Sequence, residues 1–368
     1  MKFIKWILII SFCLIIFYCN SPTSPDKSDN QGDNKNVLLE IYSPSDTSGM
    51  IIQKWVSENE KVIIDFGEYS EYTILAKSKG FYTEFYKCNK GDTININLEP
   101  VDDSKYSGTL FLTSDRIPIN IVFNQEIFII QNGDTVSTFK SDSSGHFLTE
   151  RIEYGLYTLS TFKLFGVFFS TPIIIDTTFQ NIFIEKYAIA RKPNIYIYPE
   201  EDTHIELYLN FPNGGYITES IPFYADGWEI DVTTTGKIDD KYDYLFYECN
   251  IPDYCQYQYG WVVMREDLKE FFEKNMRLYG FNDIEIGDFI DFWISRLRRY
   301  KKYIIYPQLN EQISNMVAIR ISNEIDNINR LFYGIKGTNF DDIQLSSPTI
   351  SEFRRDAFTI IEWGVILK

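Results

Sequence analysis

Short apolar or alternating runs, each interrupted by Gly, Asn or Asp, fill the stretch from Val37 to Glu185 and restrict it to a β fold. The segment KVIIDFGEYSEYTILAKSKGFYTEFYKCNKGDTININLEP is representative, because turns at Gly80 and Gly91 separate its apolar runs. Short runs without a sustained 3.6-residue period are typical of antiparallel strands. The sequence therefore predicts two antiparallel β-sandwich modules, over residues 37–107 and 108–186.

The second module carries a spaced motif within FKSDSSGHFLTERIEYGLYTLSTF, residues 139–162. An Asp and a Gly precede an aromatic strand, and a Gly-x-Tyr step leads into the next strand. This pattern resembles the transthyretin-like, carboxypeptidase-regulatory-like family, and the earlier module resembles it more weakly. The resemblance implies structural or adhesive modules that accompany catalytic domains and carry no chemistry themselves. The matching residues are Asp142, Gly145, Phe147, Gly155 and Tyr157.

Residues 190–368 mix strands with two amphipathic helical stretches, which predicts an α+β domain. The first helical stretch has its apolar residues on one face and meets Gly280 as a stop signal. The second opens with Asn282 and Glu285 at capping-box spacing. The basic residues between Arg296 and Lys302 follow it, where cations suit the negative end of a helix dipole.

Three segments of this region resemble an uncharacterised bacterial envelope domain. That domain shares a Lys-Pro-x-Ile-Tyr-x-Tyr-Pro start, a Leu-Phe-aromatic-Glu strand and a closing Glu-Trp-Gly. The resemblance covers nearly all of the region and implies a place in the cell envelope and a domain boundary, but no mechanism. The matching segments are KPNIYIYPEE (Lys192–Glu201), YLFYE (Tyr244–Glu248) and FTIIEWG (Phe358–Gly364).

The N-terminal segment predicts export. Two lysines precede an apolar run from Trp6 to Tyr18, which is shorter than the about 20 residues that a membrane-spanning helix needs. Cys19 stands where the run stops, so the segment resembles a bacterial lipoprotein signal. The resemblance implies removal of residues 1–18 and acylation of Cys19 with fatty acids such as palmitate. Phe17 and Tyr18 depart from the small residues of that pattern, and an uncleaved anchor or another cut is the alternative.

A tether and an acidic composition follow. Residues 19–36 are rich in Ser, Pro, Asp and Asn with no apolar period, so we expect a flexible segment between the membrane and the folded part. The net charge of -17 argues against nucleic-acid binding, because phosphates demand a basic surface. Expected partners are the membrane, through the lipid anchor, and a glycan or an envelope protein.

Cys249 and Cys255 in YECNIPDYCQY are candidates for a disulfide around a small loop, since export permits such bonds. The alternative is a pair of buried thiols. Cys88 is expected to be a lone strand residue. No metal site or cofactor is expected, because His146 and His204 lack the His-x-x-Glu spacing of a zinc carboxypeptidase.

Glu248 and Glu362 are the candidate catalytic residues, although neither belongs to a recognisable catalytic motif. Each lies in an apolar, aromatic strand, where an ionised carboxylate needs a partner. Converging, they could act as the acid and base of glycoside hydrolysis. The alternative is that each meets Lys192 or an Arg structurally. Trp228 and Trp363 are candidate ligand contacts, with core packing as the alternative.

The sequence therefore predicts a lipid-anchored extracytoplasmic protein of the bacterial envelope, periplasmic or surface-facing, with a binding or structural role. An enzyme is not excluded, and the alternative function is hydrolysis of an envelope glycan by Glu248 and Glu362.

The anchor can be tested at Cys19. We expect Cys19→Ala to remain unprocessed or to appear in the soluble fraction, because the acylated thiol is lost. Metabolic labelling with a fatty-acid analogue, followed by fractionation, measures both effects. Label that persists in Cys19→Ala rules this anchor out.

Overall fold

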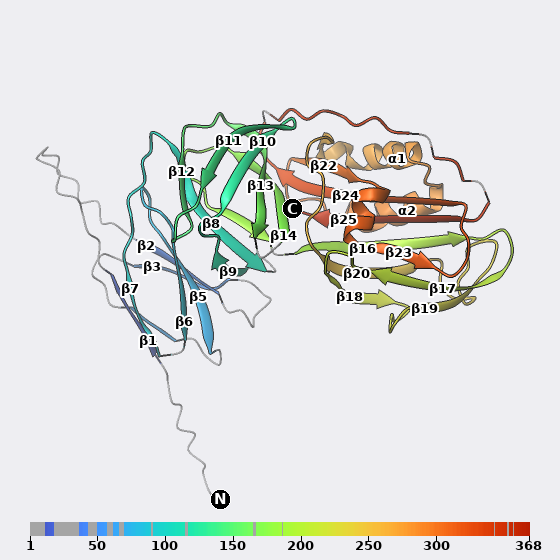
Figure 1. Cartoon of the computed structure of the whole chain (residues 1–368), viewed down its shortest axis with the longest axis horizontal. Helices are drawn as coiled ribbons and strands as arrows, with labels where there is room; N and C mark the ends of the chain where they lie inside the picture. The colour runs from blue at the N-terminus through green and yellow to red at the C-terminus, as the bar shows by residue number, and fades with distance from the viewer. Residues whose placement is uncertain are drawn as a thin grey trace, which may run out of the picture. The chain divides into compact units, whose positions relative to one another are not determined.

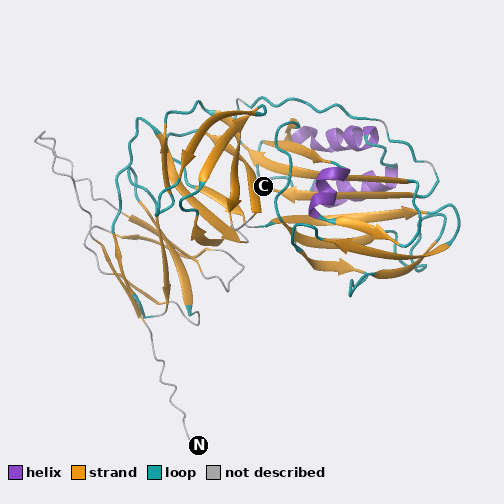
Figure 2. Cartoon of the chain, in the orientation of Figure 1, coloured by secondary structure: helices purple, strands orange, loops and turns teal. Residues whose placement is uncertain are grey.

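The computed structural model describes most of the chain, and Figures 1 and 2 show its strands and helices. Cys19 and the tether lie outside the described residues, so the lipid anchor remains a prediction. The described residues are 12–17, 37–42, 50–56, 62–65, 70–89, 91–114, 117–164, 167–185, 187–341, 343–351, 353–355 and 357–368.

The chain divides into two compact units. The stretch from 108 to 186 contributes to both of them, and the predicted domain boundaries stay predictions. The first unit comprises Met1–Ile127, Thr138–Glu153 and Thr177–Glu185, and the second comprises Phe128–Ser137, Tyr154–Asp176 and Lys186–Lys368.

Two sheets of the first unit share an apolar core. One is ordered β3-β2-β5-β6 and the other β4-β1-β7, in which β1 falls within the predicted signal. Val37, Leu39 and Ile41 of β2 are buried at alternate positions, and they cluster with Ile94 and Ile96 of β7. The bounds are β1 Phe12–Phe17, β2 Val37–Tyr42, β3 Met50–Val56, β4 Val62–Asp65, β5 Glu71–Lys77, β6 Glu84–Asn89 and β7 Thr93–Ile96.

A further sheet of the first unit has the order β12-β8-β15, with β9 paired to β8. A tight turn leads into β12, because Asp142 accepts hydrogen bonds from the backbone N–H groups of Ser144 and His146 at 2.8 and 2.9 Å. Gly145 has a φ of 78° in this turn, which favours glycine. The bounds are β8 Tyr106–Ser114, β9 Ile117–Ile121, β12 His146–Thr149 and β15 Ile182–Glu185.

A four-stranded sheet, mostly of the second unit, has the order β11-β10-β13-β14. An Asn132-Gly133 turn joins β10 to β11, and both residues have positive φ, 52° and 89°. Asn-Gly is the pair that favours such a two-residue hairpin turn. The bounds are β10 Glu126–Gln131, β11 Asp134–Lys140, β13 Gly155–Leu164 and β14 Val167–Ile175.

A seven-stranded sheet forms the centre of the second unit, in the order β18-β20-β16-β25-β24-β22-β21. Its pairs are antiparallel except β24 with β25, which are parallel. Strand β25 is buried on both faces, which explains its continuous apolar sequence. The bounds are β16 Ala188–Tyr198, β18 Tyr216–Ile221, β20 Leu245–Ile251, β21 Trp261–Met264, β22 Lys302–Gln308, β24 Asn327–Thr338 and β25 Thr359–Leu367.

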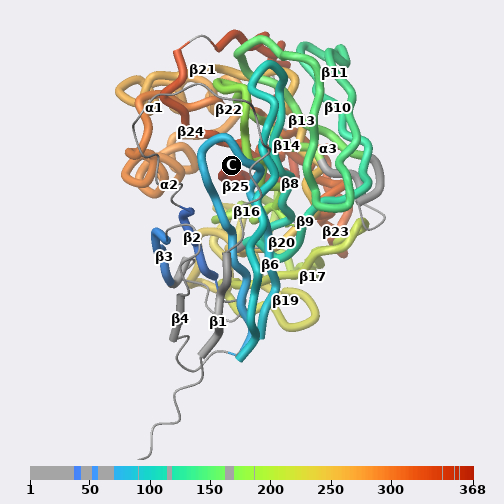
Figure 3. Tube along the Cα trace, turned by 90° about the vertical axis from the view of Figure 1, so that its left-hand side faces the viewer, coloured from blue at the N-terminus to red at the C-terminus, as the bar shows by residue number. Residues whose placement is uncertain are grey.

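Different layers cover the two faces of this sheet. Trp363 packs with Phe289 among the residues of helices α1 and α2, whereas Ile360 packs with Leu207 of the small sheet β19-β17-β23. Figures 2 and 3 show both helices on one side of the large sheet. The bounds are β17 Thr203–Asn210, β19 Trp228–Val232, β23 Ala318–Ile321, η1 Arg265–Asp267, α1 Leu268–Leu278, α2 Asp283–Trp293 and α3 Asn310–Met316.

The helix signals read from the sequence are confirmed. Gly280 follows α1 with a φ of 86°, and Asn282 and Glu285 form the reciprocal capping box of α2. At the far end of α2, Arg296 donates to the Phe292 carbonyl at 2.6 Å. The mainly β fold followed by an α+β region is confirmed as well. In the part of the chain that the structure describes, no helix has the length and apolar character to cross a membrane.

Cys249 and Cys255 are separate buried thiols, so the structure takes the second of the two alternatives left open by the sequence. Both belong to the core between the large sheet and the β19-β17-β23 sheet. The Cys255 sulfur contacts the Met316 sulfur at 3.8 Å instead of bonding to Cys249. Burial raises the pKa of both thiols, which makes them unreactive. Cys88 lies buried in β6, as expected.

We therefore expect Cys249 and Cys255 to react with iodoacetamide only after denaturation. We also expect a reductant to leave the melting temperature of the folded part unchanged, because Cys88, Cys249 and Cys255 form no disulfide in the described structure. Peptide mass mapping without reduction checks the first point. A linked peptide containing both cysteines contradicts the structure.

Candidate functional site

The three segments that resemble the envelope domain lie side by side in the large sheet. KPNIYIYP is in β16, and β16 pairs with β20, which carries LFYE, on one side and with β25, which carries EWG, on the other. Ile195 stands in register with Leu245 and with Glu362, so these three side chains share one face. The candidate residues of the sequence can therefore be assigned to faces directly.

Glu362 belongs to a buried polar network on this face. It is fully buried and accepts hydrogen bonds from the Tyr247 hydroxyl at 2.7 Å and from Nε of Arg330. Arg330, 1% exposed, also donates to the Val317 carbonyl at 2.8 Å. Burial and the neighbouring Glu362 charge raise the pKa of Tyr247, which keeps the phenol protonated as a donor. The Glu362 carboxylate is thus fully engaged by two structural partners, Tyr247 and Arg330.

Glu248 points to the opposite face of the same sheet. It follows Tyr247 directly in β20, and neighbouring strand residues alternate between faces. It is half-buried, and its nearest cation is Arg191, with 3.9 Å between Nη1 and Oε2. Burial raises the pKa of Glu248, and the Arg191 charge opposes that rise. The two carboxylates predicted as an acid and base pair are therefore not brought together.

Trp228 and Trp363 are core residues rather than exposed ligand contacts. Trp228 is 3% exposed and donates through Nε1 to the Pro222 carbonyl at 2.9 Å. Trp363 is fully buried and lies edge-on to Phe289, with 5.2 Å between ring centroids. Core packing, the alternative left open by the sequence, is therefore the outcome for both residues, because each indole is part of a hydrophobic core on one face of the large sheet.

On the Glu248 face, β16 is distorted at Lys192. The pairing register of β16 shifts at this residue against both neighbouring strands, β20 and β25. The φ of Lys192 is 53°, a left-handed backbone conformation that is costly for a lysine. The ammonium lies 4.8, 4.4 and 5.6 Å from the ring centroids of Tyr244, Phe246 and Phe292, and donates to the Tyr244 hydroxyl at 3.3 Å. Backbone strain of this kind clusters at binding and active sites, which makes the surroundings of Lys192 a candidate site.

Asp288 of α2 faces the same cluster. It accepts from the Tyr196 hydroxyl at 2.8 Å, and Asn194 donates to that hydroxyl at 3.5 Å. Burial lowers the pKa of Lys192, while the charges of Asp288 and Glu248 oppose the change. We call Lys192, Asn194, Tyr196, Tyr244 and Asp288 the Lys192 cluster.

The Lys192 ammonium and the Tyr244 hydroxyl of this cluster are donors beside aromatic rings, which suits binding of a group that accepts hydrogen bonds. The sequence analysis missed its two central members, Asn194 and Asp288. Asp288 lies about ninety residues beyond Asn194 in the chain, so only the packing of α2 against β16 brings them together. The one sequence signal near the cluster is the Lys-Pro pair at the start of KPNIYIYPEE, because it contains Lys192.

The described residues contain no group of three or more His, Cys, Asp or Glu side chains able to hold a metal ion. His146 is buried, stacked on Tyr82 with 4.3 Å between ring centroids, and 3.2 Å from the nearest Glu84 oxygen. His204 is exposed and bonds to Asp231 at 2.8 Å. The two histidines therefore lie in separate units and strands.

Comparison with known proteins gives no family. No family model and no curated protein matches the chain. The shaft pilin SpaA of Lactobacillus rhamnosus GG is 13% identical over 48% of this chain and 97% of its own, with a TM-score of 0.16. The Bacillus anthracis TIE protein is 13% identical over 66% and 44%, with a TM-score of 0.17, and a streptococcal ancillary pilin is 13% identical over 49% and 63%, also at 0.17. TM-scores this low carry no argument about function, so a functional proposal has to rest on the geometry of the site.

The buried network predicts unequal effects of two matched substitutions. Glu362→Gln should lower the free energy of unfolding by about 3 kcal/mol, because it leaves Arg330 charged, buried and unpaired. Glu248→Gln, the same change on the opposite face, should cost less than about 1 kcal/mol because its ion pair is long and partly exposed. Denaturant titration of both variants measures the difference. Equal effects contradict the structural role of Glu362.

Proposed function

We propose that the protein is a lipid-anchored component of the bacterial cell envelope that binds another envelope component without hydrolysing it. The observation that carries the proposal is the placement of Glu248 and Glu362 on opposite faces of one sheet. A glycosidase needs its two carboxyl groups about 5 to 9 Å apart across one bond. Side chains on opposite faces cannot flank one substrate.

The state of Glu362 supports the same conclusion. A catalytic carboxylate must reach solvent and substrate, whereas Glu362 has no exposed surface and holds Arg330 and Tyr247. Glu362 is therefore not available as the partner carboxylate of Glu248 in the hydrolase alternative. Binding requires no such pair, and the Lys192 cluster supplies donors and rings for it.

The anchor is part of the proposal and rests on the sequence. The positive head, the short apolar run and Cys19 support acylation, and the polar residues 19–36 support a tether. The acidic charge of the chain makes a purely electrostatic hold on anionic lipid unfavourable, so the acyl chains carry the attachment.

The proposal is tested with the full chain in mild detergent and isolated envelope material from which lipid has been extracted. We expect the protein to sediment with the insoluble polymer and to release no reducing ends from it. Serum albumin in the same detergent is the control for trapping.

Failure to sediment contradicts the binding role. Release of reducing ends that is lost in both Glu248→Gln and Glu362→Gln, with the variants still folded by circular dichroism, overturns the choice of binder over hydrolase.

A further inference from the structure

Three lysines stand at one end of the large sheet, on the face away from helices α1 and α2. They are Lys302 of β22, Lys336 of β24 and Lys368, whose N–H donates to the Ile335 carbonyl at 2.8 Å directly after β25. Lys336 pairs with Ile304 in the antiparallel ladder, and Lys302 is two residues from Ile304, so these side chains share a face. The parallel register of β24 and β25 places Lys368 beside Lys336 on that face. We call these three residues the lysine row.

The two outer lysines of the row each have a carboxylate partner. The Lys302 ammonium lies 2.9 Å from an Asp341 oxygen. Lys368 forms an ion pair with Asp253, which is buried. The Tyr257 hydroxyl donates to both Asp253 oxygens, at 2.8 and 2.9 Å. The Asp253 carboxylate is thus held by two partners.

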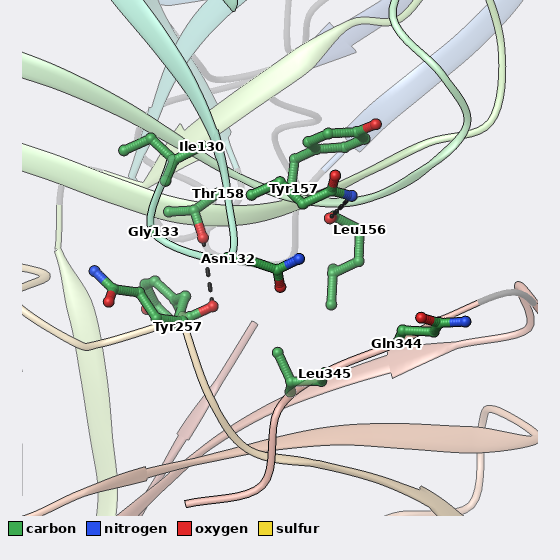
Figure 4. A pocket seen from close by; sticks show the side chains of 11 residues that line it. Ile130, Asn132, Gly133, Leu156, Tyr157, Thr158, Tyr257, Gln344 and Leu345 are labelled. Carbon is green, nitrogen blue, oxygen red and sulfur yellow. Dashed lines mark hydrogen bonds between the residues drawn. The ribbon is translucent and has the colours of Figure 1, made fainter. Parts of the chain in front are cut away.

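The segment that holds Asp253 is itself fixed. The Tyr257 carbonyl accepts a hydrogen bond from the Thr158 hydroxyl of β13 at 3.4 Å, which Figure 4 shows as a dashed line. The Tyr257 ring lies edge-on to the Tyr306 ring, with 5.1 Å between centroids. Asp253 therefore stays with Lys368 and is not available to Lys336.

Lys336, in the middle of the row, has no such partner. Among the residues that the structure describes, no carboxylate forms an ion pair with its ammonium group. Burial and the neighbouring Lys368 charge lower the pKa of Lys336 to about 8. A charge removed from water is costly unless it is paired. In its charged form Lys336 thus lacks the counter-charge that both of its neighbours have.

A hydrogen-bond donor without a partner lies next to Lys336. Tyr306 of β22 pairs with Gly334, so it is on the same face as Lys336 and diagonal to it. Its side chain is fully buried, and its hydroxyl makes no hydrogen bond within the described part of the chain. When Lys336 is protonated, three ammonium groups face two carboxylates. One positive charge is then left without compensation.

We propose that the lysine row binds one carboxylate group at Lys336 and takes up a proton with it. A single negative charge completes the pairing of the three ammonium groups, whereas a phosphate dianion exceeds it. Lys336 is only partly buried, so its side chain is in contact with the solvent from which a ligand enters. The row lies on the face of the sheet opposite to the Lys192 cluster. The proposal therefore goes beyond the binding role given above and does not depend on it.

The proton gives the site a pH dependence of defined sign. An anion favours the charged form of a neighbouring lysine. Below about pH 8 Lys336 is already mostly protonated, so affinity is highest there. Each further pH unit weakens carboxylate binding about tenfold, because the proton has to be taken up first. The other titratable groups around the row are Lys302, Lys368, Asp253, Asp341, Tyr257 and Tyr306.

The test titrates the full chain in mild detergent and chloride-free buffer with acetate and with glucuronate, at pH 7 and pH 9.5. Both acids stay ionised at either pH, so a change in affinity reports the protein. Inorganic phosphate and glucose are the comparisons, and ligand-observed NMR and calorimetry measure binding. We expect carboxylate binding at pH 7 that is at least about tenfold weaker at pH 9.5. Binding of acetate alone assigns the site to a small free acid, and tighter binding of glucuronate assigns it to a sugar-borne carboxylate.

Two variants of Lys336 separate charge from position. Lys336→Met removes the ammonium and keeps an unbranched apolar stem, so binding should be lost. Lys336→Arg stays charged at both pH values, so binding should persist and no longer weaken at pH 9.5. Lys269→Met is the control, because it makes the same change of charge on α1, at a side chain that is 64% exposed. It should leave the affinity unchanged, and circular dichroism at both pH values verifies that each variant is folded.

The proposal is wrong if no carboxylate binds at pH 7, if phosphate binds more tightly than either carboxylate, or if wild type binds equally well at both pH values. Equal weakening in Lys336→Met and Lys269→Met also contradicts it, because net charge alone would then explain the effect. If Lys336→Met does not fold, the comparison of wild type with Lys336→Arg at pH 9.5 decides the question.

Discussion

The buried ion pair between Arg330 and Glu362 is the interaction on which the second unit depends. The two residues stand directly in register on β24 and β25, the parallel pair at the centre of the large sheet. Removing two charges from water is expensive, and the cost is offset only when both are well paired. A shift of this register by one residue would leave each charge buried without its partner. The pair therefore specifies how the central strands align.

The same network connects the sheet to its neighbours. Arg330 reaches Ser314 of α3 at 3.3 Å and the Val317 carbonyl, while Glu362 reaches Tyr247 of β20. One polar cluster thus connects three strands of the sheet, β20, β24 and β25, to the segment around α3. Glu362 is therefore fully engaged in structural contacts, and the proposed binding role is assigned to the Lys192 cluster on the other face of the sheet.

Much of the fold could be predicted from the sequence because local residue patterns determine it. Glycine turns such as Gly145 and the capping box of Asn282 and Glu285 act within a few residues, and the structure has them where the pattern indicates. The sites could not be predicted in the same way. Whether Glu248 and Glu362 converge depends on strand register, and the pairing of Glu362 with Arg330 joins residues 32 apart along the chain.

A double-mutant cycle on Arg330 and Glu362 tests the central claim most directly, namely that Glu362 is a structural partner and not a catalytic group. The free energy of unfolding is measured for wild type, Arg330→Met, Glu362→Gln and the double variant. The account predicts that each single change costs about 3 kcal/mol or more, and that the double variant is much more stable than the sum of the two losses implies. Small, additive losses would contradict it, because they would mean that the two charges do not depend on each other.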